Sequence, residues 1–563
     1  MVVPELRAWR AARPRVVRVA RSVGPRLVRA AAAVKPPLVR AAEVVKPPLV
    51  RATEAVKPLV KRPSTVQFTT GAATLGLVVA ATVVTAAGPW DSTGQRTAER
   101  DWAASRERAG GADHGSVSGT SGKEPAPAPS AVSVLAGLGG SVDSVGSVPS
   151  PTEKALSGVL GPLLDDPALG TDRAGVVVDM ATGKRLYGKG ADDPLTPAST
   201  TKIATAVAAL TAAGPEHRIA TRAVLEPGTE EVVLVGGGDP TLTARKDADG
   251  NASLRDLADD TARALKSRET GKTGKTGKTD KGGKGGKGGK AAEVTLSYDT
   301  SLYAGSAVHP IGAGNTNLAP VTALMADEGR LDDSSSGPAD RSDDPAADAA
   351  EKFADLLHER GIRTTVPGTS KASARAKTLA TVKSPPLSAL VERMLTSSDN
   401  DIAEALARQT ALAAGEPASF KGGGAATHEQ LKKLGLPLKG AKFADGSGLD
   451  RADKLTADLL TALLAEAADQ DRPELRPVLT GLPVAGFTGT LSKRYEGRPG
   501  TGLVRAKTGT LTGVHTLAGT VVDTDGRLLA FAFLTESDPP TDATTTQQGL
   551  DTLASTLATC GCD

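Results

Sequence analysis

Ser199 and Lys202 have the side-chain types and the spacing needed for acyl transfer. They stand at the head of segment 197–210, where Ile203, Val207 and Leu210 recur at helical spacing. Side chains three residues apart share one face of a helix. A helix start favours a serine alkoxide, and desolvation could lower the pKa of Lys202 until it accepts the serine proton. Taken alone, this pattern more often indicates a serine that caps a helix.

A second polar group lies almost two hundred residues later. Ser398 and Asn400 flank Asp399 in a predicted loop before a helix that includes 403–408. The structural interpretation is N-capping, which Ser, Asp and Asn all do well. The chemical interpretation gives Ser398 a proton-relay role and Asn400 a hydrogen bond to a substrate amide.

A third group lies on a predicted strand that ends at about residue 510. Lys507 and Thr508 can bind a carboxylate through charge and a hydroxyl group, and Gly509 lets a substrate approach the backbone. The same Lys-Thr-Gly triplet recurs in the tract 271–290, which has no preceding apolar strand. The predicted strand therefore distinguishes the triplet at 507–509 from those in the tract 271–290.

The tract 271–290 also resembles a phosphate-binding loop. That motif needs a glycine five positions before the glycine of Gly-Lys-Thr, where this chain has Glu269 and Lys272. The phosphate-loop interpretation fails, and we predict a solvated surface insertion. A second polar segment, 327–348, is predicted to be a loop.

The amino-terminal region has a strong charge asymmetry. Residues 1–63 hold fifteen Lys and Arg against three Glu, although the net charge of the whole chain is only +3. Segment 66–87 is uncharged and apolar, and about twenty such residues span a bilayer as one helix. We expect a disordered basic tail (1–65) in the cytoplasm, a single membrane-spanning anchor (66–87) and a disordered extracellular linker (88–151). Cleavage of the anchor and secretion is the less favoured alternative.

Several function classes have little support in the composition. Aromatic residues make up 2% of the chain, which argues against stacking on single-stranded nucleic acid. No His lies in an HExxH pattern, so a zinc hydrolase is not indicated. Cys560 and Cys562 could pair with each other or lie free in a tail, and they are too few for a four-cysteine zinc site.

The three groups occur in the order S-x-x-K, Ser-Asp-Asn, Lys-Thr-Gly, each in its expected setting. The chain resembles the D-alanyl-D-alanine carboxypeptidase/endopeptidase family of class C, low-molecular-mass penicillin-binding proteins (peptidase S13) over about residues 152–562. The resemblance rests on segments 195–202, 236–242, 398–400, 445–448, 485–491 and 507–510.

The resemblance implies an α/β transpeptidase-like fold, an antiparallel sheet flanked by helices. The catalytic domain would comprise 152–219 and 386–563, with an accessory region inserted at 220–385. Ser199 would form the acyl-enzyme, Lys202 act as general base and Ser398 relay a proton. Asn400, Lys507, Thr508, Gly509 and Thr510 would bind substrate, and the N–H groups of Ser199 and Thr510 would form the oxyanion hole.

The same resemblance implies peptidoglycan peptides and β-lactams as the molecules bound, with no metal or organic cofactor. A β-lactamase remains a nearby alternative, and a non-catalytic wall-binding or sensor module a more distant one. His515, close to the Lys-Thr-Gly segment, is a tempting base, but we favour a structural role for it.

Overall fold

The computed structural model describes residues 151–275, 292–365 and 367–560. The predicted basic tail, membrane anchor and nearly all of the linker lie outside these ranges, as do Cys562 and most of the tract 271–290. Within the described ranges, no helix combines the length and apolar character needed to cross a membrane.

The first sheet is antiparallel and has the strand order β2-β1-β11-β10-β9. The hairpin of β1 and β2 lies far from the other three strands in the sequence. It joins them because β1 pairs along its whole length with β11. Strand β9, which carries the Lys-Thr-Gly segment, forms one edge of this sheet. The bounds are β1 Asp172–Asp179, β2 Arg185–Lys189, β9 Val504–Leu511, β10 Val514–Val522 and β11 Leu528–Glu536.

Helices cover both faces of this sheet, because successive strand residues point to opposite sides and both sets are apolar. Ala518 and Ala532 pack with α6 and α12, whereas Leu517 and Phe531 pack with α5 and α14. The helices of this first lobe are α5 Glu153–Leu164, α6 Thr201–Ala213, α9 Leu387–Ser397, α10 Asn400–Ala414, α11 Phe420–Lys433, α12 Ala457–Ala468, α13 Pro477–Thr480 and α14 Ala543–Thr559.

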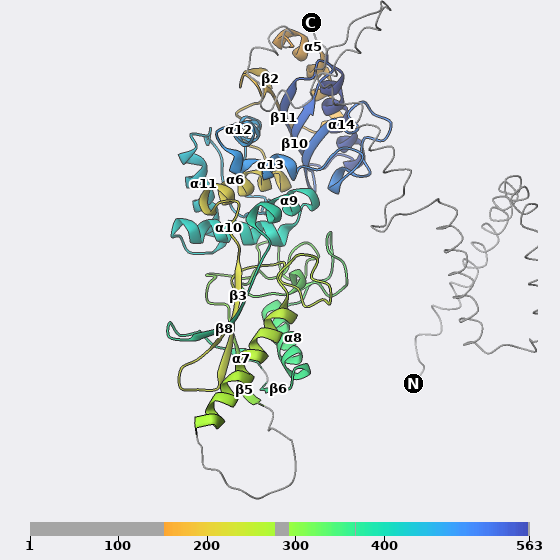
Figure 1. Cartoon of the computed structure of the whole chain (residues 1–563). Helices are drawn as coiled ribbons and strands as arrows, with labels where there is room; N and C mark the ends of the chain where they lie inside the picture. The colour runs from red at the N-terminus through yellow and green to blue at the C-terminus, as the bar shows by residue number, and fades with distance from the viewer. Residues whose placement is uncertain (1–150, 276–291, 366, 561–563) are drawn as a thin grey trace, which may run out of the picture. The chain divides into compact units, whose positions relative to one another are not determined.

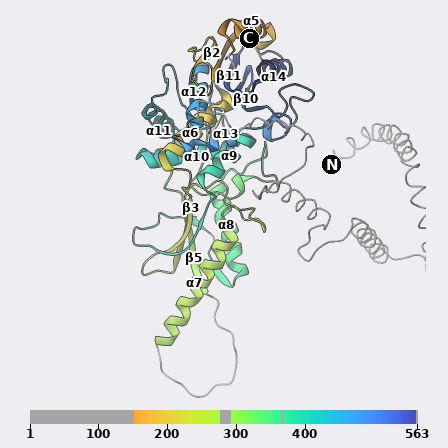
Figure 2. The same ribbon diagram turned by 45° about the horizontal axis from the view of Figure 1, so that its top comes forward.

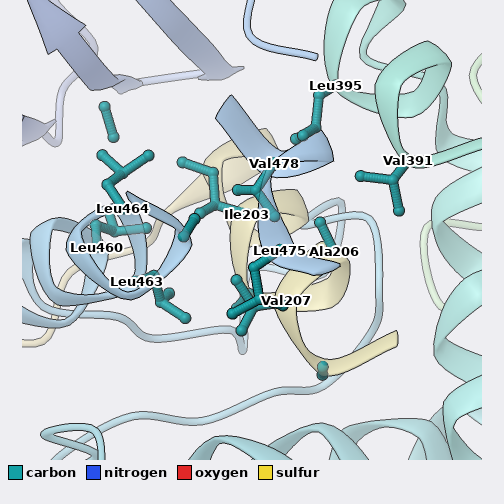
Figure 3. Packing of buried hydrophobic residues seen from close by; sticks show 14 of the residues in the cluster. Ile203, Ala206, Val207, Val391, Leu395, Leu460, Leu463, Leu464, Leu475 and Val478 are labelled. Atoms are coloured by element: carbon teal, nitrogen blue, oxygen red, sulfur yellow. The ribbon is translucent and has the colours of Figure 1, made fainter. Parts of the chain in front are cut away.

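Helix α6 lies in the middle of the apolar core. All residues from Thr201 to Leu210 are buried. Figure 3 shows Ile203 and Val207 among side chains such as Leu460 and Val478. A helix buried on every side can shift only if its neighbours shift, so Lys202 is carried on a rigid element.

The second sheet, with its two helices, forms the second lobe. Its order is β6-β5-β4-β3-β8, with β7 beside β5; β3 pairs antiparallel with β4 and β8, and β5 pairs parallel with β4, β6 and β7. Figures 1 and 2 both show α7 and α8 running alongside it. The bounds are β3 Ala220–Leu225, β4 Glu231–Val235, α7 Leu254–Lys275, β5 Ala292–Asp299, α8 Pro345–Glu359, β6 Ile362–Thr364, β7 Gly368–Thr369 and β8 Lys377–Lys383.

The segment 327–348 is largely the loop that its composition predicted, although part of it is buried. It is mostly irregular, but Glu328, Arg330 and Ser342 are buried, and α8 already begins at Pro345. Asp344 caps that helix by accepting a hydrogen bond from the N–H of Ala347. These polar residues can be buried because several of them bind one another inside the protein.

Candidate active site

Ser199 lies in a single 3₁₀ turn, Ala198–Thr200, that leads directly into α6. Ala198 has a φ of 46°, a left-handed conformation that costs energy in a residue with a Cβ. Gly448 packs so closely beneath this turn that a Cβ there would lie 1.9 Å from the carbonyl oxygen of Ala198. The turn that presents the serine is therefore held by the packing around it.

Lys202 is fully buried and makes three polar contacts through Nζ. Its partners are Ser199 Oγ at 3.0 Å, Asn400 Oδ1 at 2.7 Å and the carbonyl oxygen of Ser447 at 2.6 Å. Burial lowers the pKa of this amine to about 8, and the buried carboxyl groups around it, led by Asp445, oppose that shift.

The turn between α9 and α10 resolves the two interpretations of Ser-Asp-Asn. Asp399 is the cap, since its Oδ1 accepts a hydrogen bond from the N–H of Ile402 at 3.0 Å. Ser398 has a left-handed φ of 57°, and Asn400 is the first residue of α10. The capping function therefore falls on Asp399, which leaves Ser398 and Asn400 to contact the two lysines.

Lys507 on β9 approaches Ser398 from the other side. Its Nζ donates to Ser398 Oγ at 2.8 Å and to the carbonyl oxygen of Thr508 at 2.8 Å. Burial, and then repulsion by Lys202, lower the pKa of this amine well below its usual value. Direct side-chain contacts thus join Lys202 to Ser199 and Asn400, and Lys507 to Ser398, and Ser398 lies two residues before Asn400.

The remaining predicted residues follow along β9. The hydroxyl of Thr508 donates to Thr490 Oγ1 at 3.0 Å, Gly509 packs against the backbone of the Ser199 turn, and Thr510 has an exposed side chain. Thr490 carries no predicted role from sequence. Its only signal was its place in the family-like segment 485–491.

A buried hydrogen-bond network that lies next to Lys202 was not predicted from the sequence. Glu404 Oε1 accepts hydrogen bonds from the N–H groups of Gly446 at 3.0 Å and Ser447 at 2.9 Å, and Oε2 accepts one from Arg408 at 3.2 Å. Glu404 therefore orients the Ser447 carbonyl that accepts from Lys202. The available signals were Glu404 itself, one turn after Asn400, and the segment 445–448.

Asp445 forms the other half of this network. Its carboxylate accepts from the N–H groups of Gly448 at 2.6 Å and Asp450 at 2.7 Å and lies 2.9 Å from His309 Nε2. Because His309 Nδ1 accepts from the N–H of Ile311, Nε2 is the nitrogen that donates to Asp445. Burial would raise the pKa of Asp445, but these hydrogen bonds lower it to about 2.

Among the described residues, two groups of buried side chains are of the types that bind metal ions and lie close together. The first is His309, Glu404 and Asp445, and the second is Glu328, Asp399 and Asp401. In the first, each side chain is bound by donors or acceptors of the chain itself. In the second, arginines approach all three carboxylates. We therefore interpret both groups as hydrogen-bond and charge networks.

His515 lies on the face of the first sheet opposite to Ser199. It shares that face of β10 with Leu517 and Val521, which pack in the cluster under α14, whereas Thr516 points to the Ser199 turn. Burial lowers the pKa of His515. Its position agrees with the structural role favoured from sequence.

Comparison with known proteins identifies the family. The profile of the D-Ala-D-Ala carboxypeptidase 3 (S13) family matches residues 156–335 and 332–557. The chain belongs to this family. Its S13 relatives include carboxypeptidase DacB of Mycolicibacterium smegmatis, which is 36% identical over 74% of this chain and 86% of its own length. A carboxypeptidase of Mycobacterium tuberculosis is 34% identical over 78% of this chain and 91% of its own length.

Among solved structures, penicillin-binding protein 4 of Haemophilus influenzae has the same fold. It aligns with a TM-score of 0.56 at 21% identity, over 72% of this chain and 99% of its own. The S13 membership confirms the family and the serine carboxypeptidase class expected from the motifs. The mixed α/β penicillin-binding fold is confirmed as well.

Proposed function

We propose that the chain is a penicillin-sensitive serine D-Ala-D-Ala carboxypeptidase that trims peptidoglycan stem peptides through an acyl-enzyme on Ser199. One observation carries the proposal. A neutral lysine amine has two N–H donors and one lone pair. Asn400 Oδ1 and the Ser447 carbonyl can accept both N–H bonds, which leaves the lone pair for the Ser199 hydroxyl at 3.0 Å.

Acylation then begins with proton transfer. Neutral Lys202 takes the proton of Ser199, and Oγ attacks the carbonyl carbon of the penultimate D-alanine. The N–H groups of Ser199 and Thr510 stabilise the oxyanion, a device worth about 10²–10³ in rate per donor. As the C–N bond breaks, Lys202 gives up the proton that it took from Ser199, and the Ser398 hydroxyl relays this proton to the leaving amine, so that Lys202 is neutral again.

The departing D-alanine carries a carboxylate. Lys507, whose amine lies 2.8 Å from Ser398 Oγ, and Thr508 bind it, and the negative charge of the carboxylate favours the charged form of this lysine. Asn400 holds the acyl side of the substrate through its amide group. Water then attacks the ester with Lys202 as base, which returns the proton to Ser199 and frees the shortened peptide.

The Ser199→Ala variant tests this proposal. We expect the full chain to release D-alanine from a defined pentapeptide and to bind a labelled penicillin covalently, and Ser199→Ala to do neither. Ser306→Ala, an exposed serine of the second lobe, is the matched control and should behave as the wild type. D-alanine release by Ser199→Ala at the wild-type rate would contradict the proposal.

The lifetime of the penicillin adduct separates this function from a β-lactamase. A long-lived adduct supports a carboxypeptidase, whereas rapid turnover of the drug supports the alternative. Incubation with a cross-linked peptide dimer, followed by mass analysis of the products, reports whether the same serine also cleaves cross-links as an endopeptidase.

We also propose that segment 66–87 anchors the chain in the cell membrane, with the catalytic lobe on the outer side. The proposal is supported by the uncharged apolar run and by the fifteen basic residues before it. We expect the full chain in the membrane fraction and a variant lacking 1–87 in the soluble fraction. An exported protein that is soluble and shortened at its amino terminus would contradict the anchor and favour cleavage.

A further inference from the structure

Segment 317–341 of the second lobe contacts the first turn of α10. Asn400 Nδ2 donates to the carbonyl oxygen of Asn317 at 3.0 Å. Asp401, the next residue, accepts from the N–H of Ala319 through Oδ1 at 3.0 Å and pairs with Arg341 through Oδ2 at 3.0 Å. Both carboxylate oxygens of Asp401 are thus bound by the second lobe.

The Arg341–Asp401 ion pair is shielded from water. The two side chains are 3% and 2% exposed. Burial, and then the charge of Asp399, raise the pKa of Asp401 to about 7, and Arg341 opposes that rise. Removing one member of a buried pair leaves the other without a partner, so this contact constrains the backbone far more than a surface pair does.

A second ion pair crosses between the lobes beside this one. Glu328 pairs with Arg393 of α9 and accepts from Arg330 Nε at 2.8 Å, and Arg341 donates to its carbonyl oxygen at 3.3 Å. Arg245, Arg330 and Arg393 line a cavity of about 400 Å³, but each already pairs with a carboxylate of this chain. Of these three arginines, only Arg393 pairs with a residue of the other lobe. We call its pair with Glu328, together with the Arg341–Asp401 pair, the clamp between the lobes.

The clamp acts close to the reacting groups. Asn400 is held through its side chain by Lys202 on one side and by the carbonyl of Asn317 on the other. Its backbone is fixed between the cap residue Asp399 and the clamped residue Asp401. A shift of Asp401 would therefore move Asn400 relative to Ser199.

We propose that Arg341, acting through Asp401, positions Asn400 for substrate, so that the second lobe supports acylation without contributing a catalytic residue. The inference rests on the proposed function and adds positioning residues to it. Small misplacements of binding groups can cost about 10²-fold in rate.

A double-mutant cycle tests the proposal in the full chain. We expect Arg341→Gln and Asp401→Asn each to slow acylation by a labelled penicillin by about 10- to 100-fold. In the Asn400→Ala background, adding Arg341→Gln should change the rate by less than about twofold, because the residue through which Arg341 acts is gone. Arg363→Gln, an exposed arginine on β6, is the matched control and should have no effect.

The outcomes separate this inference from the proposed function. An effect of Arg341→Gln that is equally large in the Asn400→Ala background would overturn the positioning role, as would a wild-type acylation rate in both single variants. If Arg341→Gln does not fold, Asp401→Asn, which keeps the side-chain shape, carries the same cycle. A wild-type chain that releases no D-alanine would instead contradict the proposed function.

Discussion

At the scale of single residues, the proposed mechanism requires that the environment of Lys202 allow this lysine to lose its proton. An exposed lysine holds its proton at neutral pH, whereas burial here lowers the pKa to about 8. The charge of Lys202 in turn lowers the pKa of Lys507, after the larger effect of burial. Burying the charged form of Lys202 is costly, and the carboxyl groups around this lysine offset part of that cost.

The pH dependence of acylation follows from this shift. Only the neutral amine can accept a proton, and a base is neutral above its pKa. Roughly one-tenth of Lys202 is therefore neutral at pH 7 and most of it at pH 9. We expect the rate of acylation at saturating labelled penicillin to rise between pH 7 and 9 with a midpoint near 8.

Lys202→Arg is the control for that profile. A guanidinium group stays charged over the whole range, so this variant should show no acylation at any of these pH values. A wild-type rate that is flat from pH 7 to 9, or that falls, would show that Lys202 is not the titrating base.

At the scale of secondary-structure elements, the site depends on how closely β9 approaches the turn that carries Ser199. Thr516 on β10 donates to the carbonyl oxygen of Pro197 at 2.8 Å, which ties the turn to the sheet. Gly509 lies between them, and a Cβ at this position would lie 2.7 Å from that carbonyl oxygen and 2.1 Å from Thr516 Oγ1. Only glycine lets the strand and the turn meet.

Gly509→Ala should therefore separate β9 from Ser199. We expect a loss of stability of about 1–3 kcal/mol, typical of overpacking, and a larger fall in acylation rate, since Lys507 and Thr508 move with the strand. Thermal unfolding and penicillin labelling measure the two effects.

Gly368→Ala on β7 is the matched control for this substitution. A Cβ there would have open space, so we expect stability and labelling to match the wild type. Normal labelling of Gly509→Ala would mean that the contact between β9 and the turn does not set the site.

At the scale of the whole described region, two lobes have separate apolar cores and share one site. Phe353 and Leu357 of α8 pack with Leu257 of α7 in the core of the second lobe, apart from the clusters around the first sheet. The second lobe nevertheless reaches the site through Asn317 and the Arg341–Asp401 pair. Its folding should therefore matter for catalysis.

Phe353→Ala tests this dependence. Truncating a fully buried phenylalanine costs about 3–5 kcal/mol, and that loss should fall on the second lobe. We expect calorimetry to show an earlier transition for this lobe, with penicillin labelling lost across that transition.

Phe353→Leu, which leaves a smaller cavity, should shift the transition less. The informative comparison is labelling measured at temperatures between the two transitions of Phe353→Ala. Labelling that persists there would show that the first lobe holds Asn400 without help.

The amino-acid sequence by itself determined the chemistry of this protein. Ser199, Lys202, Ser398, Asn400 and Lys507 could be named because three short motifs occur in order, at a helix start, a turn and a strand, and resemble those of the S13 family. The strands β9, β10 and β11 could also be predicted from the sequence, since alternating or continuous apolar runs between turn residues are local signals.

Only the tertiary structure decided what surrounds those residues. Glu404 and Ser447, which orient the acceptor for Lys202, and Arg341, which pairs with Asp401, come from segments far apart in the chain. The polar segment 327–348 gave no sign of burial, because a charged residue is buried only where a partner meets it in space. Partners brought together by long-range packing leave no spacing pattern, so the support of the site became visible only in the folded chain.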